Sequence, residues 1–365
     1  MRKNKSRYLA LYERVRDDII SGVYPHSKKL PSKRNMANDY GVSVITVEHA
    51  YELLEEEGYI TSSEKKGYFV IYDPDNQFQV SGNKASNNTT AYKPVEFKST
   101  DKDGLTFSQY ARTVRKVISA YGERIMERSE SFGCEYIRNA IASYIFRSRK
   151  LQVDPKRIII GSGAEYLYGL IIKVLGNRIV YGIESPSYKK IAYIYESEHV
   201  KTHALSLTHD GIESSELWNA DIQALHITPY RSYPSGVTAS ASKKHEYLKW
   251  CNEKNAIIIE DDFESEFSPS RKPEETVFYL NNGKNVIYVN TFTRTIGAFL
   301  RVAYMVVPED MVDNFKKTVG FLSCTVPTPE QYIIAELLEN GEFERHINRV
   351  RRRKREELKN VLDNT

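Results

Sequence analysis

Residues 28–60 read "KKLPSKRNMANDYGVSVITVEHAYELLEEEGYI", and this stretch decides the fold of the front of the chain. Ser32 and Ser43 are favoured N-cap residues, so each predicts the start of a short helix. Gly41 between them supplies a turn. Both segments carry apolar residues at helical spacing: Met36, Ala37, Tyr40, Val47, Ala50, Tyr51 and Leu54. Two short helices around a glycine-containing turn predict a helix-turn-helix.

The flanking segments extend this unit in both directions. Upstream, a further helix is predicted by apolar residues at helical spacing, and Gly22 and Pro25 end it: Tyr8, Leu11, Tyr12, Val15 and Ile19. Downstream, "GYITSSEKKGYFVIY" predicts two strands around a polar tip at residues 65–67. Residues 1–72 are therefore predicted to form a winged helix-turn-helix.

The exposed residues of this unit suit duplex DNA. The second helix of the pair would enter the major groove by its N-terminal end, where hydroxyls and backbone amides can meet phosphate. The candidate DNA-binding residues are Arg34, Ser43, Val44, Thr46, Lys65, Lys66 and Gly67. The alternative is a three-helix protein-interaction domain with ordinary surface lysines, because a helix-turn-helix pattern alone is weak evidence.

The order of the motifs favours DNA binding. "LPSKRNMA", "GVSVITVEHAYELLEEEGYI" and "KKGYFV" together resemble the winged helix of GntR-type bacterial regulators over residues 7–72. Val44 departs from that pattern, because relatives usually carry arginine there, but valine can contact a thymine methyl group. Glu48 stands where some relatives carry a basic residue, and it would repel phosphate unless it faced a cytosine amine.

A change of composition separates this unit from the rest of the chain. Residues 73–95 lose all periodicity and are rich in Gly, Asn, Ser and Thr, which is typical of a flexible linker. In residues 96–365, helical segments alternate with nearly continuous apolar strands such as "RIIIGSG", "ALHITP", "AIIIEDDF" and "VIYVNTF". This alternation predicts an α/β domain with a mostly parallel sheet flanked by helices.

Ligands of such sheets bind beyond the carboxyl ends of the strands, so the residues after each strand are the candidates. "GSGAE" could cradle a phosphate with backbone amides of residues 162–164, although many strand-to-helix turns carry glycine. "TFTRTIGAFLR" offers Thr291, Thr293 and Arg301, which suit an anion. Tyr188 offers a flat face or is an ordinary core aromatic. Asp261 and Asp262 could bind a metal, but no His-rich partner set accompanies them.

These pieces occur together in one known arrangement. The chain resembles MocR regulators, which are GntR winged helices fused to a fold-type I aminotransferase-like domain, in the order of its segments "GSGAEYLYGL", "ESPSYKK", "TPYRSYPSG", "IIEDDFESEF", "TFTRTIGAFLRVAYMVVP" and "FERHINRVRR". The resemblance implies pyridoxal phosphate as the ancestral ligand. It also implies that Tyr188 is the aromatic residue that stacks on the cofactor ring and that Asp261 is the carboxylate that faces the pyridine nitrogen. The residues that it matches to the phosphate cup are Ser162, Gly163, Ala164, Thr291, Thr293 and Arg301.

The chain departs from that family at its central residue. The resemblance puts the Schiff-base lysine at position 294, where this chain has arginine, whose guanidinium stays protonated and is no nucleophile. Phe263 replaces the family's tyrosine, and Ala303 replaces a glycine. The chain also ends at the helix that leads into the small C-terminal domain, so the large domain is expected to be truncated. Arg349–Arg355 are expected to lie on a solvated helix face, with contact to DNA phosphates as the alternative.

Composition sets the remaining expectations. The 365 residues are 41% hydrophobic and 27% charged with a net charge of +4, and Cys134, Cys251 and Cys324 form no disulfide pattern. No apolar stretch could span a bilayer, so a cytoplasmic protein is expected. We expect a homodimeric transcriptional regulator that is no enzyme, senses a small effector, and binds pyridoxal phosphate non-covalently at most through a site including Arg294. The alternatives are an active aminotransferase fused to a DNA-binding domain, or a truncated DNA-binding protein that senses nothing.

Overall fold

The computed structural model describes residues 7–63, 66–73, 103–263, 265–270 and 274–363. The chain divides into two compact units, residues 1–97 and residues 98–365. The predicted linker lies outside the described residues beyond Asp73, and so does Lys65 at the predicted tip of the wing.

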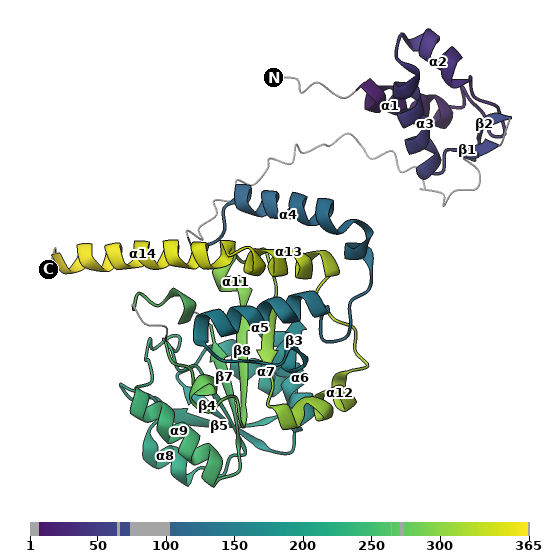
Figure 1. The fold of residues 1–365 in the computed structure, drawn as a ribbon. Coiled ribbons are helices and arrows are strands. Elements are labelled where there is room, and N and C mark those ends of the chain that lie inside the picture. The colour runs from purple at the N-terminus through teal and green to yellow at the C-terminus, as the bar shows by residue number, and fades with distance from the viewer. Residues whose placement is uncertain (1–6, 64–65, 74–102, 264, 271–273, 364–365) are drawn as a thin grey trace, which may run out of the picture. The chain divides into compact units, whose positions relative to one another are not determined.

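The N-terminal unit is a winged helix-turn-helix (Figure 1). Its elements are α1 (Arg7–Ile20), α2 (Lys33–Tyr40), α3 (Val44–Glu56), β1 (Ile60–Ser63) and β2 (Gly67–Val70). Ser32 caps α2 by accepting a hydrogen bond from the amide of Asn35, and Ser43 caps α3 in the same way from Thr46. Gly41 ends α2 with a φ of 61°, a left-handed conformation that glycine adopts without strain. The caps and the turn that the sequence predicted at Ser32, Gly41 and Ser43 are therefore confirmed.

The core of this unit follows the predicted periodicity. Three helices and both strands contribute buried apolar side chains, among them Leu11, Val15, Met36, Val47, Ala50, Leu54, Ile60 and Val70. β1 and β2 form an antiparallel pair, and Lys29 bridges to Phe69 on its open edge. Tyr8 and Tyr40, which also fall at helical spacing, are only partly buried.

The large unit is built on a seven-stranded sheet in the order β3-β9-β8-β7-β6-β4-β5. Its strands are β3 (Ile158–Gly161), β4 (Val180–Ser185), β5 (Lys201–Ser206), β6 (Ala224–Ile227), β7 (Ile257–Asp262), β8 (Val286–Thr291) and β9 (Ala303–Val306). Strands β4 to β8 pair in parallel, whereas β9 runs antiparallel to both β3 and β8. The mostly parallel sheet that the sequence predicted is confirmed.

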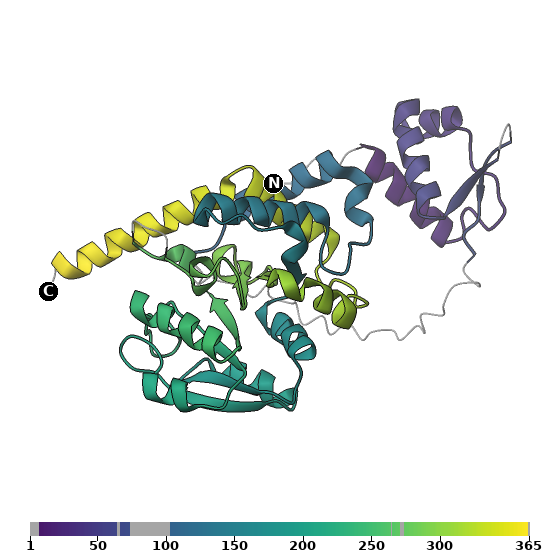
Figure 2. The same ribbon diagram turned by 60° about the horizontal axis from the view of Figure 1, so that its bottom comes forward.

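Helices cover both faces of this sheet (Figures 1 and 2). They are α4 (Phe107–Tyr121), α5 (Glu135–Arg149), α6 (Ala164–Leu175), α7 (Lys189–Ser197), α8 (Ser214–Asn219), α9 (Ala241–Glu253), α10 (Val277–Leu280), α11 (Phe292–Thr295), α12 (Val312–Val319), α13 (Thr328–Glu339) and α14 (Glu342–Asp363). Short 3-10 helices occupy Gly122–Met126, Pro155–Arg157, Ser265–Phe267 and Glu309–Met311.

Alternate strand residues fill two separate cores. Ile258 and Val286 belong to the core under α4, α5, α9, α13 and α14, whereas their neighbours Ile259 and Ile287 belong to the core under α6, α7 and α12. Because successive side chains of a strand point to opposite faces, a sheet covered on both sides needs continuous apolar strands. The polar edge strand β5 lacks this signature, and the sequence did not predict it.

Candidate functional sites

The N-terminal end of α3 presents an exposed surface of small and apolar side chains. Val44 and Ile45 are 43% and 63% exposed, and neither has a role in the core. The hydroxyl of Ser43 lies 2.8 Å from that of Thr46 and also accepts from the Thr46 amide at 3.1 Å. Arg34 on α2 is exposed as well. Three of the predicted DNA-binding residues, Ser43, Val44 and Thr46, therefore lie at the start of one helix, and Arg34 is exposed on the preceding helix.

The wing places two more predicted residues at a hairpin. The Lys66 amide donates to the Ser63 carbonyl at 2.9 Å, which closes the turn, and the Lys66 side chain is exposed. Gly67 has a φ of 102°, and a Cβ there would lie 3.0 Å from the Cε of Lys29. The structure thus brings Lys29 to the wing, a residue that the sequence did not single out.

Glu48 has an environment that the sequence did not predict. Its carboxylate pairs with Lys33 of α2 at 2.5 Å, and this hydrogen bond lowers the pKa of Glu48. The Lys33 ammonium also lies 5.6 Å from the centre of the Tyr68 ring. The negative charge of Glu48 is therefore compensated by Lys33 within the unit. This pair reduces the expected repulsion between Glu48 and phosphate.

In the large unit, a cavity of about 640 Å³ lies at the carboxyl ends of β7 and β8. Seven of the predicted cofactor-site residues line it: Ala164, Tyr188, Asp261, Thr291, Thr293, Arg294 and Arg301. Ser162 and Gly163 do not line the cavity, although they immediately precede Ala164 at the start of α6. The amide of Ser162 donates instead to the Thr325 hydroxyl at 3.1 Å.

The N-terminal end of α6 suits an anionic group. Gly163 precedes the helix with a φ of 110°, and no side chain caps the first turn. A Cβ at Gly163 would lie 2.9 Å from the guanidinium Nη2 of Arg301, so only glycine lets arginine approach this turn so closely. Arg301 pairs with Glu165 at 3.3 Å, and Glu165 also pairs with Lys190 at 3.1 Å.

Asp261 forms the buried end of the cavity. Its carboxylate accepts a hydrogen bond from the Tyr168 hydroxyl at 2.7 Å. Burial raises the pKa of Asp261 to about 6, and the neighbouring charge of Asp262 acts in the same direction. A carboxyl group poised in this way can share a proton with a basic ring nitrogen. Tyr188 is 43% exposed at the cavity wall, so the alternative that it is a core aromatic is wrong.

Arg294 lines the cavity and also contacts residues that do not line it. It pairs with Asp103 at 3.5 Å, and its guanidinium lies 5.8 Å from the centre of the Phe267 ring. Asp103 also pairs with Arg353 and, at 3.6 Å, with Lys354, both from α14. The residue at the position of the family lysine is therefore part of an electrostatic cluster formed by α11, α14 and the segment that precedes α4.

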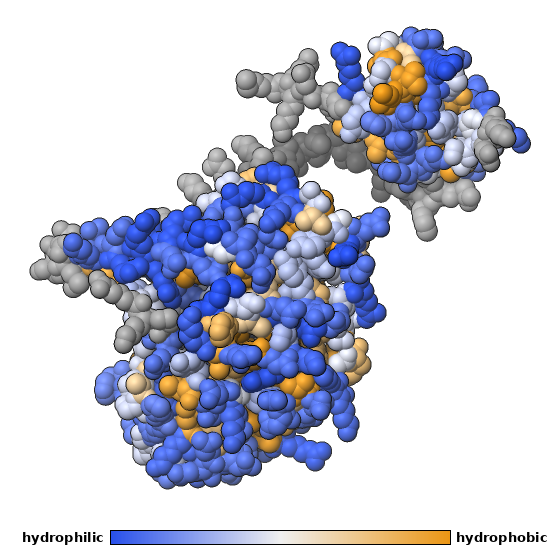
Figure 3. Space-filling model, in the orientation of Figure 1, coloured by the Kyte–Doolittle hydropathy of each residue, from blue (hydrophilic) through white to orange (hydrophobic). Residues whose placement is uncertain are grey.

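The basic run of α14 differs from its prediction. Arg352 and Arg355 are exposed, and the surface over α14 is hydrophilic in Figure 3. Arg351 and Arg353 are instead half-buried, and the Nε of Arg351 donates to the Glu266 carbonyl at 2.5 Å. The expectation of a wholly solvated helix face was wrong because this side of α14 packs onto the large unit and meets acceptors there.

Several cavity residues were missed by sequence reasoning. Lys190, Arg231 and Tyr233 line the cavity together with Glu165 and Tyr168. Lys190 matters most, because no lysine stood near position 294 in the sequence, whereas folding brings this amine into the same cavity. Its hydrogen bond to Glu165 raises the pKa of Lys190, which favours the protonated amine. Its place two residues after Tyr188 was the only available signal.

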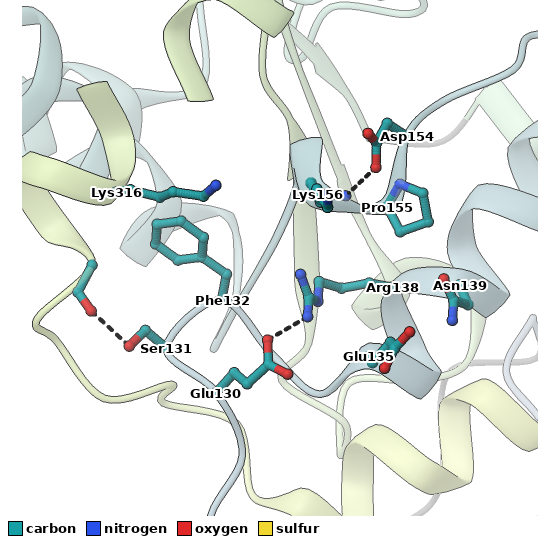
Figure 4. Close-up of a pocket in the computed structure, with 11 residues that line it drawn as sticks. Glu130, Ser131, Phe132, Glu135, Arg138, Asn139, Asp154, Pro155, Lys156 and Lys316 are labelled. Carbon is teal, nitrogen blue, oxygen red and sulfur yellow. Dashed lines mark hydrogen bonds and ion pairs between the residues drawn. The ribbon is translucent and has the colours of Figure 1, made fainter. Parts of the chain in front are cut away.

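A second depression of about 570 Å³ lies beside the start of α5 (Figure 4). Its basic side chains are Arg138, Lys156 and Lys316, and its acidic side chains are Glu130, Glu135 and Asp154. Arg138 is already paired with Glu130. Because three acids balance three bases, this depression has no formal preference for an anion.

Within the described residues, no group of His, Cys, Asp and Glu side chains is arranged to hold a metal ion. Asp261 and Asp262, which raised that possibility, have separate partners on opposite faces of β7. The described helices include none with both the length and the apolar character needed to cross a membrane.

Each of the two units matches a known protein family. Residues 7–70 match the family of bacterial regulatory proteins of the gntR type, and residues 101–364 match aminotransferase class I and II. The chain is 28% identical over 365 residues to the uncharacterized HTH-type transcriptional regulator YdeL of Bacillus subtilis, covering 98% of this chain and 78% of that protein.

Two further similarities bear on the large unit. The chain is 25% identical over 362 residues to the probable rhizopine catabolism regulatory protein MocR of Rhizobium meliloti, covering 94% of this chain and 73% of that protein. The structure resembles that of the α-aminoadipate aminotransferase LysN of Thermus thermophilus, which was solved in complex with N-(5'-phosphopyridoxyl)-L-leucine. The TM-score is 0.60 and the sequence identity is 20%. That match covers 70% of this chain and 66% of LysN, just under two thirds of its length.

Proposed function

This chain belongs to the aminotransferase class I and II family and joins that domain to a gntR-type regulatory domain in the MocR arrangement, and from this membership we propose that it regulates transcription in response to a small anionic ligand. The N-terminal unit binds operator DNA, and the large unit binds the ligand without chemical conversion. YdeL is named as an HTH-type transcriptional regulator and MocR as a probable regulatory protein, which supports the DNA-binding role.

The DNA contacts are assigned to the exposed residues of α3 and the wing. Ser43 and Thr46 would contact phosphate, whereas Val44 would contact a base in the major groove. Arg34 and Lys66 would add phosphate contacts, as would Lys65 if the wing reaches the DNA. The exposed apolar side chains at the start of α3 support this assignment, because they have no packing role within the unit.

The ligand proposal rests on the chemistry of the cavity. Pyridoxal phosphate fits the cavity residues as a non-covalent ligand: the first turn of α6, which begins at Ala164 and has no side-chain cap, suits the phosphate, together with Arg301 and the hydroxyls of Thr291 and Thr293. Tyr188 would stack on the ring. Asp261, with its pKa raised to about 6, would meet the pyridine nitrogen.

The cavity does not fit a covalent cofactor equally well. Bound pyridoxal phosphate supplies an electron sink for amino acid chemistry when a neutral lysine amine holds its aldehyde. Position 294 offers a permanently charged guanidinium, and Phe263 offers no hydroxyl group. The observation that carries the non-catalytic proposal is therefore Arg294, paired with Asp103 in the place of the family lysine.

A homodimer is the assembly that we propose for this regulator. A single winged helix makes few contacts, and two units that read two half-sites gain affinity through their effective concentration. Sedimentation of the full chain at micromolar concentration should give a dimer, and a strict monomer would refute this part of the proposal.

The function is tested with the full chain and a duplex that contains the promoter region of its own gene. Binding should be saturable, should weaken steeply with salt and should change at least about threefold when pyridoxal phosphate is added. Ligand-independent DNA binding would leave a regulator without a sensor. Turnover of an amino acid and a keto acid by the same preparation would favour the alternative, an active aminotransferase with a DNA-binding domain.

A further inference from the structure

Helix α3 carries none of the side chains that usually read bases through paired hydrogen bonds. Its sequence from Val44 to Glu56 is VITVEHAYELLEE, which contains no arginine, lysine, asparagine or glutamine. Arginine and lysine are the usual partners of guanine, and asparagine and glutamine are those of adenine. Glu48 could accept a hydrogen bond from cytosine, but its carboxylate already pairs with Lys33 at 2.5 Å. The base contacts of this helix therefore need a different chemistry.

The charges of α3 determine which end of the helix can approach DNA. Its C-terminal half carries Glu52, Glu55 and Glu56, whose carboxylates repel phosphate. Its N-terminal half has one acid, Glu48, and Lys33 compensates that charge. The match of residues 7–70 to gntR-type regulatory proteins supports duplex DNA as the partner of this helix. The first turn of α3 is therefore the part that we assign to the groove.

The first turn of α3 exposes two consecutive branched apolar side chains. Val44 and Ile45 are 43% and 63% exposed, whereas Val47 is buried in the core of the unit. Successive residues of a helix project about 100° apart, so the two side chains can reach different base pairs. In the major groove, thymine presents an apolar 5-methyl group to the protein. Val44 and Ile45 thus match a feature of the bases that is recognised without hydrogen bonds.

We propose that the first turn of α3 selects its half-site by the 5-methyl groups of thymine, with Val44 and Ile45 as the contacting side chains. The inference rests on the proposed DNA-binding function and adds the chemical feature by which the DNA is chosen. Burial of one methyl group against an aliphatic side chain corresponds to about a fourfold gain in affinity. Cytosine carries hydrogen at the same ring carbon, so 5-methylcytosine would present the same group to this surface.

The test uses the full chain and a duplex that the chain itself enriches from a random-sequence pool. Each thymine of the enriched site is replaced in turn by deoxyuridine, which lacks only the 5-methyl group, and affinity is measured by fluorescence anisotropy at one salt concentration. Each thymine that contacts Val44 or Ile45 should weaken binding about fourfold when it is replaced. A cytosine–guanine pair at the same place should also weaken binding, and 5-methylcytosine there should recover about fourfold of that loss.

Two variants assign the methyl groups to their side chains. Val44→Ala and Ile45→Ala should each remove the preference for thymine over deoxyuridine at one base pair and leave the salt dependence unchanged. Alanine favours the helix more than valine or isoleucine does, so a loss of affinity would not come from a frayed helix. Val23→Ala, at an apolar residue of the same unit that is 58% exposed outside α3, is the control and should keep both preferences. His49→Ala, at an exposed polar residue of α3, should keep them as well.

The possible results separate this inference from DNA binding itself. A site in which deoxyuridine replaces every thymine, and which binds within about 1.5-fold of the parent site, would overturn the inference and leave DNA binding intact. A thymine preference that survives in both alanine variants, or that is lost in His49→Ala, would also overturn it, because other side chains would then read the site. If the full chain bound no duplex in a salt-dependent manner, the proposed DNA-binding function would fail together with the inference.

Discussion

Asp262 at the end of β7 forms a 3.0 Å ion pair with Arg149 of α5, inside the core of the large unit. The same carboxylate accepts hydrogen bonds from Ser265 at 2.6 Å and from Tyr288 at 2.7 Å. The preceding residue, Asp261, points to the opposite face of the sheet and into the cavity. Two adjacent acids therefore have separate tasks, one structural and one at the candidate ligand site.

Arg149→Met should destabilise the large unit strongly. Both partners of the pair are nearly buried, with side-chain exposures of 12% and 3%, so loss of the cation leaves an uncompensated carboxylate. The expected loss is about 3–5 kcal/mol. Urea unfolding followed by tryptophan fluorescence measures it, because Trp218 and Trp250 both lie in this unit. Lys249→Met in the exposed pair with Glu253 is the control and should cost under about 1 kcal/mol.

Lys66→Gln should weaken DNA binding through salt dependence and not through base preference. A lysine that contacts phosphate contributes about one unit to the slope of log affinity against log salt concentration. The variant should lower that slope by about one unit and keep the ranking of operator variants. Lys249→Gln, in the large unit, should leave the slope unchanged. An unaltered slope for Lys66→Gln would remove the wing from the DNA contact surface.

Glu184→Gln should make stability less dependent on pH. Glu184 of β4 accepts from Ser232 at 2.6 Å and from the Thr228 amide at 3.1 Å, and burial raises its pKa to about 7. The folded state thus holds a proton that the unfolded chain releases near its ordinary pKa of about 4.5. The free energy of unfolding should fall as pH rises through this window, by at most about 3 kcal/mol from this group.

The measurement for Glu184 is the difference between wild type and variant in urea unfolding at several pH values between 4.5 and 8. The variant should gain stability relative to the wild type as pH rises, because its amide never ionises. Other buried carboxyl groups, such as Glu260 and Glu266, contribute equally to both proteins and cancel in the difference. A difference that stays constant across this range would contradict the prediction.

Borohydride treatment of the wild-type chain with pyridoxal phosphate should fix no stoichiometric adduct. Arg294 has no reactive amine, and the amine of Lys190 is held in its charged form by Glu165 at 3.1 Å. Peptide mapping by mass spectrometry locates any adduct. Full labelling at Lys190 would show that this lysine has taken over the role of the family residue and would revive the aminotransferase hypothesis.

The fold was predictable because its signals are local. Ser32, Gly41 and Ser43 mark the boundaries of α2 and α3 through caps and a left-handed turn, which depend on neighbouring residues alone. The parallel strands were readable for a related reason, since a strand buried on both faces must be apolar throughout. β5 escaped prediction because it lies at the edge of the sheet, where five of its six side chains are exposed.

The candidate site was predictable only in part. Residues that directly follow strands, such as Asp261 and Thr291, were readable from the rule that ligands bind at the carboxyl ends of parallel strands. Lys190 and the pair between Arg294 and Asp103 depend on packing between segments far apart in the sequence. No local pattern of residue types encodes such a contact, so the counter-ion of Arg294 came only from the folded chain.

The cluster around Asp103 has a consequence for recombination between regulators of this kind. Asp103 pairs with Arg294 of α11 and with Arg353 of α14, and the Leu105 amide donates to the Ile296 carbonyl directly after α11, so both residues belong with the large unit even though they precede its first helix. A chimera that exchanged gntR-type modules by joining two parents at the start of α4 would pair the acid of one parent with the bases of another. A crossover placed before residue 103 keeps acid and bases together, and such hybrids should be the ones that stay soluble and responsive.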